Sequence, residues 1–161
     1  MKFSPETFPM IEGHEPVASD AIADTCDAVY VGGADGVWII VHEDYAVNAT
    51  QLVMTVNEGT TSALAIGGSP ITATYGGWKN ITAQTSDAIT ALTAAATFTL
   101  DGETAGNNCL WWVYIPAAIL TDGYDWIQAD FADGNAGNLA NVVYILDGAR
   151  YKSASPPTAV A

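Results

Sequence analysis

The chain has 161 residues, half of them hydrophobic, and eighteen acidic against four basic residues give it a formal net charge of −14. This length suits one compact domain, and the hydrophobic content excludes intrinsic disorder of the chain as a whole. So few lysines and arginines exclude binding to nucleic acid and docking on anionic membranes, because both need cations that neutralise phosphate charge.

The first 17 residues are apolar but interrupted by Pro5, Pro9 and Pro16. Because proline breaks regular structure, we expect an extended N-terminal arm over residues 1–17, a single β-sandwich domain over 18–152 and an extended C-terminal tail over 153–161. The start of the chain lacks the apolar stretch of a signal peptide, and no run approaches the roughly 20 apolar residues of a membrane span. The sequence therefore predicts a cytoplasmic site of synthesis and no membrane partner.

Short runs of β-branched and aromatic residues, separated by Gly, Asn and Asp, predict an all-β protein. The expected strands, in chain order, are Ala28–Val31, Val37–His42, Thr50–Asn57, Ile71–Tyr75, Trp78–Ala83, Thr97–Asp101, Cys109–Ile115, Tyr124–Phe131 and Leu139–Leu146. Turn signals recur between them, which favours an antiparallel, jelly-roll-like β-sandwich.

Two patterns of burial are expected among these strands. In Gln51–Asn57 apolar and polar residues alternate, as in a strand with one face in the core. Val37–Val41 and Val142–Leu146 are apolar throughout, which predicts central strands buried on both faces.

Helical structure is expected only as one or two short turns. Pro116–Leu120 is the best candidate, because proline favours the first position of a helix and Asp122-Gly123 would end it. Ala18–Ala28 and Ser86–Ala96 are weaker candidates, and in the second the mixture of Ala and Thr favours helix and extended structure equally.

Two pairs of residues leave alternatives open. Cys26 and Cys109 either form a disulfide or are buried free thiols. Trp111 and Trp112 are neighbours in a predicted strand, so their side chains should point to opposite faces. Either one ring enters the core and the other faces outward or meets a partner, or both lie in a core that covers both faces.

The sequence predicts a protein that is not an enzyme and needs no cofactor. His14 and His42 are the only histidines, and the nucleophile-elbow, phosphate-loop, dinucleotide and zinc-protease motifs are absent. Asp101–Glu103 and Asp133–Asn138 could offer oxygen ligands to calcium, but neither has the register of an EF-hand, so no metal site is predicted.

The last third of the chain carries a resemblance to a known group of proteins. Cys109–Ile115 leads through a short turn into Asp122-Gly123-Tyr124, and a late apolar strand ends in Gly148-Ala149-Arg150-Tyr151 before a proline-containing tail. This arrangement resembles the capsid decoration (cement) and minor head proteins of β-sandwich type from tailed bacteriophages. The resemblance is closer over residues 109–161 and looser over 28–161.

The resemblance implies a role rather than a reaction: binding to the outer surface of the capsid shell, with the major capsid protein as partner and a homotrimer as the favoured oligomer. It implies a virion protein that is assembled in the host cytoplasm. Because the few cations gather near the termini, the hypothesis places the contacts with the shell or a sister subunit at Phe3, Phe8, Met10, Ile11, Trp112, Arg150, Tyr151 and Lys152.

A second hypothesis is a carbohydrate- or host-surface-binding module of a phage tail or fibre. The chain has five tryptophans and seven tyrosines, and an outward ring of the Trp111-Trp112 pair could serve as a platform for a sugar.

Overall fold

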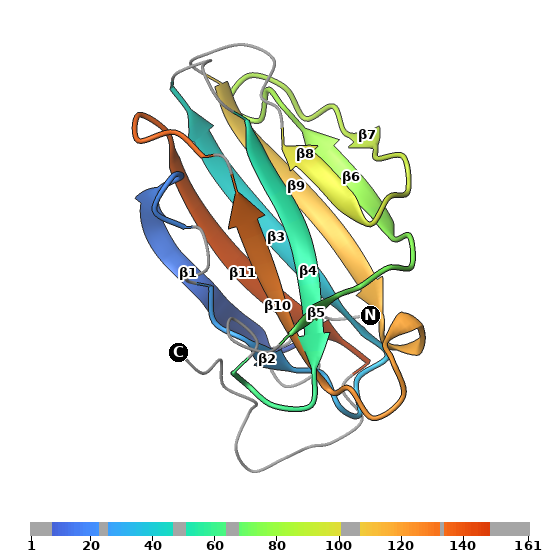
Figure 1. Cartoon of the computed structure of the whole chain (residues 1–161). Coiled ribbons are helices and arrows are strands. Elements are labelled where there is room, and N and C mark those ends of the chain that lie inside the picture. Colours follow the sequence, from blue (N-terminus) through green and yellow to red (C-terminus); the bar gives the residue numbers. More distant parts are fainter. Residues whose placement is uncertain are drawn as a thin grey trace.

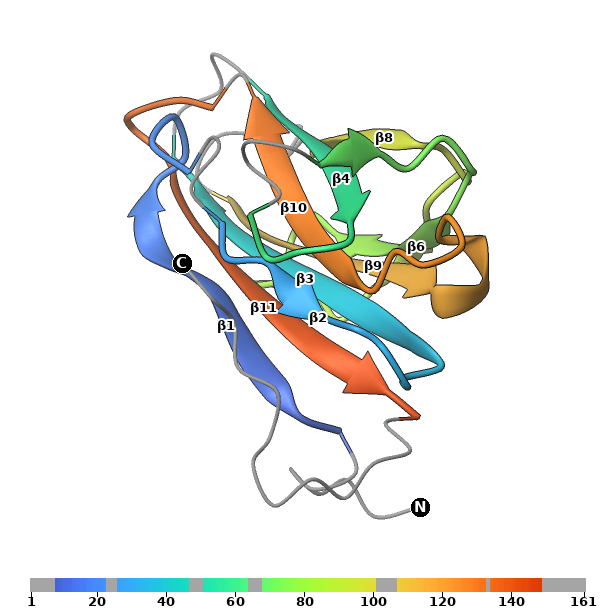
Figure 2. The same ribbon diagram turned by 60° about the horizontal axis from the view of Figure 1, so that its bottom comes forward.

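Two antiparallel β-sheets pack face to face in the computed structural model, which describes residues 8–22, 26–46, 51–63, 68–100, 107–132 and 134–148 (Figures 1 and 2). The six-stranded sheet consists, in spatial order, of β1 (Met10–Ala18), β11 (Leu139–Asp147), β3 (Gly36–Tyr45), β9 (Asn107–Pro116), β6 (Gly76–Asn80) and β7 (Thr90–Ala91). The other sheet consists of β2 (Val29–Tyr30), β10 (Trp126–Ala132), β4 (Leu52–Gly59) and β5 (Ser69–Pro70), and β8 (Thr97–Leu100) also pairs with β4. The prediction of an all-β sandwich is confirmed.

The chain passes from one sheet to the other at most of its connections, as in a jelly roll. From β8 to β11 every connection changes sheet, so the long central strands β3, β9 and β11 lie side by side although they are far apart in the sequence (Figure 1). The predicted turn at Pro116–Leu120 is a single 3-10 turn, Ala117–Ile119, with Pro116 at its N-cap.

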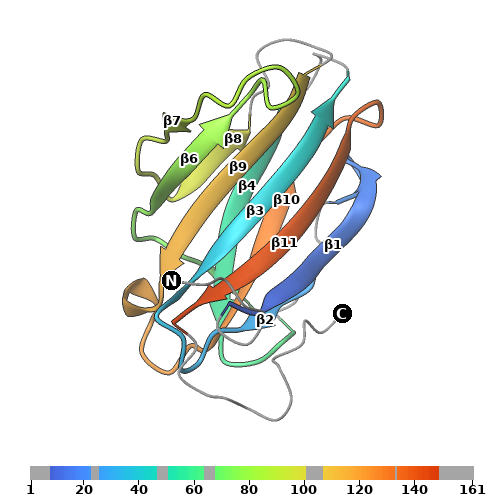
Figure 3. The same ribbon diagram turned by 180° about the vertical axis from the view of Figure 1, so that it is seen from behind.

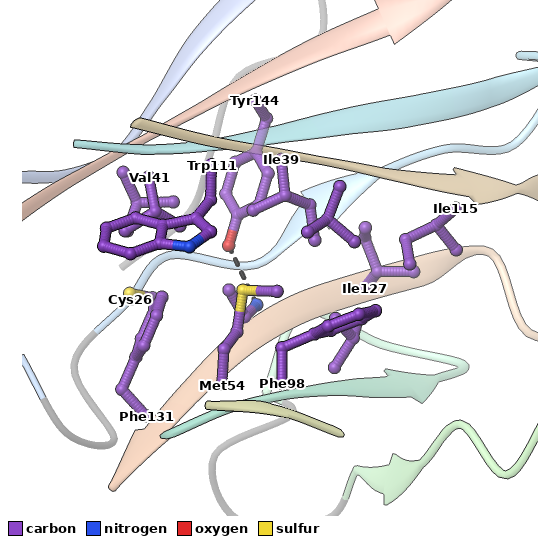
Figure 4. Packing of buried hydrophobic residues seen from close by; sticks show 14 of the residues in the cluster. Cys26, Ile39, Val41, Met54, Phe98, Trp111, Ile115, Ile127, Phe131 and Tyr144 are labelled. Carbon is purple, nitrogen blue, oxygen red and sulfur yellow. Dashed lines mark hydrogen bonds between the residues drawn. The ribbon is translucent and has the colours of Figure 1, made fainter. Parts of the chain in front are cut away.

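The core lies between the two sheets and is built by alternation of buried and partly buried residues along the long strands β3, β9 and β11. The six-stranded sheet sends Ile39, Val41, Trp111 and Tyr144 inward, where they meet side chains of the other sheet such as Phe131 (Figure 4). Burial of this apolar surface, at roughly 25 cal/mol per Å², is the main source of stability.

Tyr144 joins the two sheets through a hydrogen bond inside the core. Its hydroxyl oxygen accepts a bond of 3.0 Å from the backbone N–H of Ala129 in β10 (Figure 4). β2 pairs only with Trp126 and Ile127 of β10. The Ala129 N–H lies two residues further along β10, beyond this pairing, and the Tyr144 hydroxyl is its acceptor. Since an unpaired buried N–H costs free energy, this contact fixes the spacing of the layers.

Cys26 and Cys109 are both buried free thiols, which resolves the first alternative that the sequence left open. The Cys109 thiol lies 3.4 Å from the carbonyl oxygen of Ile81 and donates to it. The backbone oxygen of Cys26 accepts a hydrogen bond from the Gln128 amide.

The predicted boundary between the N-terminal arm and the sandwich is wrong for residues 10–17: this segment is extended, as expected, but it belongs to the sandwich as the edge strand β1, which pairs with β11. Its burial alternates at Met10, Ile11 and Glu12, so it has the pattern of a half-buried strand. Pro16 fits because an edge strand leaves one row of backbone groups free of ladder hydrogen bonds, and the register shifts near it. Residues 1–7 and the predicted tail 153–161 lie outside the described residues.

One local prediction is also wrong, and in Ser86–Ala96, where helix and extended structure were both left open, the described strand β7 is extended. The strand expected over Ile71–Tyr75 is displaced, because the paired residues are Ser69 and Pro70 and only Tyr75 forms an isolated bridge, with Ala95. Neither weaker helix candidate forms in the described residues: Ala18 ends β1, and the Ser86–Ala96 segment contains β7. Pairing with neighbouring strands overrides the weak helix propensity of these alanine-containing segments.

Glu58, near the end of β4, accepts two hydrogen bonds from the connection between β9 and β10. The Thr121 backbone N–H donates to Glu58 Oε2 at 2.8 Å, and the Thr121 hydroxyl donates to Glu58 Oε1 at 2.5 Å. Glu58→Ala should lower the free energy of unfolding by about 1–3 kcal/mol, because it leaves the Thr121 N–H without its acceptor. Urea denaturation measures this, and Thr121→Ser, which keeps both donors, is the control. Equal stability of Glu58→Ala and the unmodified protein would contradict the assignment.

Candidate functional site: the outer face of the six-stranded sheet

The outer face of the six-stranded sheet is apolar where the outer face of a sandwich is ordinarily polar. Over part of their length, the central strands β3, β9 and β11 each place two large apolar side chains outward at alternate positions. Figure 3 shows the strands of this sheet from its outer side. These outward residues are Trp38 and Ile40 of β3, Trp112 and Tyr114 of β9, and Val143 and Ile145 of β11.

The strand register brings these side chains into two adjacent rows. In one row Ile40 pairs with Val143 on one side and with Trp112 on the other, and Trp112 pairs in turn with Trp78 of β6. In the next row Trp38 lies between Ile145 and Tyr114. Directly paired residues share a face of the sheet, so four aromatic rings gather on this side.

A glycine allows β6 to lie close to β9. A Cβ atom on Gly77 would overlap the carbonyl oxygen of Trp112, so a residue with a side chain would force the two strands apart. The next residue, Trp78, is thereby held against the ring system: the centroids of Trp38 and Trp78 are 5.7 Å apart, and those of Trp38 and Tyr114 are 4.7 Å apart, with the rings tilted. These are ordinary distances for packed aromatic pairs.

A groove of about 460 Å³ opens over these rings. Its lining consists of Phe8, Trp38, Ile40, Trp78, Ile89, Trp112 and Ile145. Trp78 is 42% exposed and Ile89 is 61% exposed, and Met10 on the neighbouring edge strand is 59% exposed. Contiguous exposed apolar side chains of this size mark surfaces that are covered in the functional state.

A smaller hollow of about 280 Å³ lies further along the same face and is more polar. His42 and Asp44 of β3 line it, with Asn108 of β9 and Asn141 of β11. The outer face is therefore apolar over its aromatic half and carries hydrogen-bonding side chains over the other half.

A tyrosine–carboxylate pair lies next to Trp38 on the same face. The Tyr114 hydroxyl donates to Asp147 Oδ2 at 3.2 Å. Burial, and after it the negative charge of Asp147, raises the pKa of Tyr114. The Tyr114 hydroxyl therefore stays protonated at neutral pH and orients its ring beside Trp38.

Of the interface residues that the sequence predicted, the structure places some on the outer face and one in the core, and the others lie outside the described residues. Phe8 and Trp112 line the groove, and Met10 is exposed on the outer side of β1. Ile11 is wrong as an interface residue, because the alternation of β1 turns it into the core, where it is buried. Phe3, Arg150, Tyr151 and Lys152 lie outside the described residues.

Sequence reasoning missed Trp38, Trp78 and Ile89, although a signal for two of the strands was present. The apolar stretches Val37–Val41 and Val142–Leu146 predicted burial on both faces, and this is wrong: their outward residues are only partly buried. In a sandwich of two layers, an unbroken apolar strand means an apolar outer face.

The remaining titratable and metal-ligating side chains lie outside the groove or make hydrogen bonds within the fold. His14 Nδ1 donates a hydrogen bond of 2.7 Å to the backbone carbonyl oxygen of Glu15. Within the described residues, no cluster of three or more His, Cys, Asp or Glu side chains could hold a metal ion. Asp101–Glu103 and Asp133, from the loops considered for calcium, are outside those residues, and Asn135 accepts a hydrogen bond from the Gly137 N–H at 2.8 Å. No helix in the described ranges has the length and hydropathy to cross a membrane.

Comparison with models of protein families, with curated proteins and with solved structures finds no match to this chain.

Proposed function

We propose that this protein is a non-enzymatic capsid decoration protein, which binds the outer surface of a tailed-bacteriophage head shell and stabilises it. The observation that carries the proposal is the aromatic groove on the open face of the six-stranded sheet. Contiguous exposed apolar side chains on a sheet face mark a surface that binds a partner. The major capsid protein is the proposed partner.

Two features of the chain support this assignment beside the groove. The sequence over residues 109–161 resembles decoration proteins, as described above. The net charge of −14 keeps such a protein from adhering to the nucleic acid that the shell encloses. The proposed homotrimer would use surfaces other than the groove, and light scattering of the purified protein measures it directly.

Engaged carboxylates support a binding role rather than a catalytic one. Asp130 accepts a hydrogen bond of 3.3 Å from the Asn57 amide, and Asp147 accepts one from Tyr114. Both oxygens of Glu58 accept hydrogen bonds from Thr121. These contacts orient structural elements of the sandwich.

Co-sedimentation with a purified shell tests the proposal. A major capsid gene is expected beside the gene for this chain, and the shell assembled from its product is the probe. The unmodified protein should sediment with the shell in a fixed ratio, and Trp78→Ala should weaken binding by about tenfold or more, as removal of a central aromatic contact does.

The matched control is Tyr30→Ala, because Tyr30 is 40% exposed and lies in β2 of the opposite sheet. It should bind the shell like the unmodified protein. A protein that stays in the supernatant, or equal binding by Trp78→Ala, would contradict the proposal.

A carbohydrate-binding module is the second candidate, and the polar hollow favours it. His42, Asp44, Asn108 and Asn141 could bind hydroxyl groups of a sugar whose ring stacks on Trp112. The groove itself has an apolar and aromatic lining, which suits a protein side chain better than a hydroxylated ring. Glycan-array binding that is lost in both Trp112→Ala and Asn141→Ala would favour the sugar.

A further inference from the structure

Four carboxylates lie close in register or in sequence to the apolar residues of this outer face. Glu12 is exposed on β1 and pairs with Val143, on the flank of the groove. On the opposite flank, exposed Asp87 lies two residues before Ile89. Asp147 accepts a hydrogen bond from Tyr114 and follows Ile145 by two residues in β11, and exposed Asp44 lies four residues beyond Ile40 in β3, where it lines the polar hollow. We call Glu12, Asp44, Asp87 and Asp147 the acidic rim.

The described residues offer this rim no matching cations on the same face. Lys79 is the one lysine or arginine among them, and it pairs with Trp111, which points into the core, so it faces away from the groove. Among the described residues, the face therefore combines an apolar centre with carboxylates near its border.

We propose that the partner of this face is a protein surface with an apolar centre bordered by lysine and arginine side chains. This inference rests on the proposed function and specifies the chemistry of its partner. Opposite charges around an apolar contact accelerate association and reject surfaces of the wrong sign.

The same charge pattern argues against a second copy of this chain as the occupant. Two copies packed groove to groove would bring two acidic rims together, and like charges across an interface cost free energy. A basic border removes that cost and leaves the apolar contact favourable.

Two synthetic amphipathic helical peptides provide the probe. They share one apolar face of leucine and tryptophan, and their polar faces carry either lysine or glutamate. We expect the lysine peptide to bind the full chain at least about tenfold more tightly than the glutamate peptide in low salt, with the preference shrinking in high salt. Titration calorimetry measures both affinities, and Trp78→Ala should weaken binding of the lysine peptide.

Two variants of equal charge separate a site on this face from general attraction to an acidic protein. The rim variant Glu12→Gln/Asp44→Asn/Asp87→Asn should lose about tenfold in affinity, mainly through slower association. The control variant Asp20→Asn/Asp122→Asn/Asp125→Asn removes three exposed carboxylates from connections outside the six-stranded sheet and should lose less than about twofold. Circular dichroism confirms that both fold.

Three outcomes would overturn the inference: equal binding of the two peptides, equal losses in the two triple variants, or a dimer that Trp78→Ala dissociates. The shell experiment separates this failure from that of the proposed function. If the rim variant binds the shell like the unmodified protein, only the basic-partner inference fails. If the chain binds the lysine peptide through this face but not the shell, only the decoration function fails.

Discussion

Trp111→Ala should lower the free energy of unfolding by about 3–5 kcal/mol, whereas Trp112→Ala, one residue later, should lower it by roughly 1 kcal/mol. Trp111 is fully buried between the sheets, so its removal opens a large cavity that rigid strands close only in part. Trp112 lies on the outer face, where water or a partner fills the space. Urea denaturation of both variants measures the difference.

Shell binding, unlike stability, should depend on the outward ring of Trp112. Trp112→Ala should weaken shell binding by about tenfold or more while the sandwich stays folded, because its ring lines the groove. A protein whose stability falls equally in both variants would contradict the assignment of one ring to the core and one to the surface.

Trp111→Phe isolates packing from hydrogen bonding. The indole N–H of Trp111 is buried and has no hydrogen-bond partner within the described part of the chain. Phenylalanine removes this unsatisfied donor and keeps most of the apolar contact, so the variant should recover most of the loss seen in Trp111→Ala. Destabilisation by Trp111→Phe as large as by Trp111→Ala would show that the N–H is bonded.

The sequence predicted the central strands well because their signals are local. Val37–His42 and Cys109–Ile115 lie inside β3 and β9, and the alternation of Leu52, Met54 and Val56 is that of β4. Each of these strands carries its own periodicity, and glycine-rich turns bound several of them. No tertiary information is needed for such a prediction.

The edge strand β1 could not be predicted in the same way. Pro9 and Pro16 made its segment look unstructured, and the place of β1 at an edge, which tolerates proline, depends on the topology of the whole sheet. The aromatic groove is likewise a product of register: Trp38, Trp78 and Trp112 become neighbours only through pairing of β3, β9 and β6. Sequence separation hides such a site, although the outward orientation of one ring of the Trp111-Trp112 pair was among the alternatives.

Alkaline pH should destabilise the sandwich steeply, because buried acids of high pKa keep their protons only in the folded state. Burial raises the pKa of Tyr144 well above 10, and burial raises the pKa of Tyr75 to about 12. The pKa of the Cys26 thiol is also raised well above its usual range, first by burial and then by Asp27 and Asp130. Each group has an ordinary pKa in the unfolded chain.

The sign follows from proton linkage. Below pH 9 both states of the protein hold these protons, and the stability that the groups contribute is fully present. Above pH 9 for Cys26 and above pH 10 for the tyrosines, the unfolded state loses protons that the folded state retains, so the free energy of unfolding falls by about 1.4 kcal/mol per pH unit for each group. The contribution of Tyr75 stops changing once the pH passes about 12.

Tyr144→Phe tests this account with two separate readouts. At pH 8 the variant should be less stable by about 1–3 kcal/mol, because the Ala129 N–H loses its acceptor. Between pH 10 and 11 its stability should fall less steeply than that of the unmodified protein, by about 1.4 kcal/mol per pH unit, since one of the titrating groups is gone. Urea denaturation across this range gives both quantities, and tyrosinate absorbance reports whether the hydroxyls ionise with unfolding.

Tyr75→Phe and Cys26→Ala extend the comparison. Each should reduce the fall in the free energy of unfolding per pH unit, and the effect of Cys26→Ala should begin near pH 9 rather than pH 10. An unchanged slope in Tyr144→Phe would mean that water reaches this hydroxyl in the folded state. The two sheets would then be less tightly packed around Tyr144 than its complete burial indicates. A reduced slope instead shows that the alkaline limit of the fold depends on Tyr144, whose hydroxyl bonds the two layers across the core.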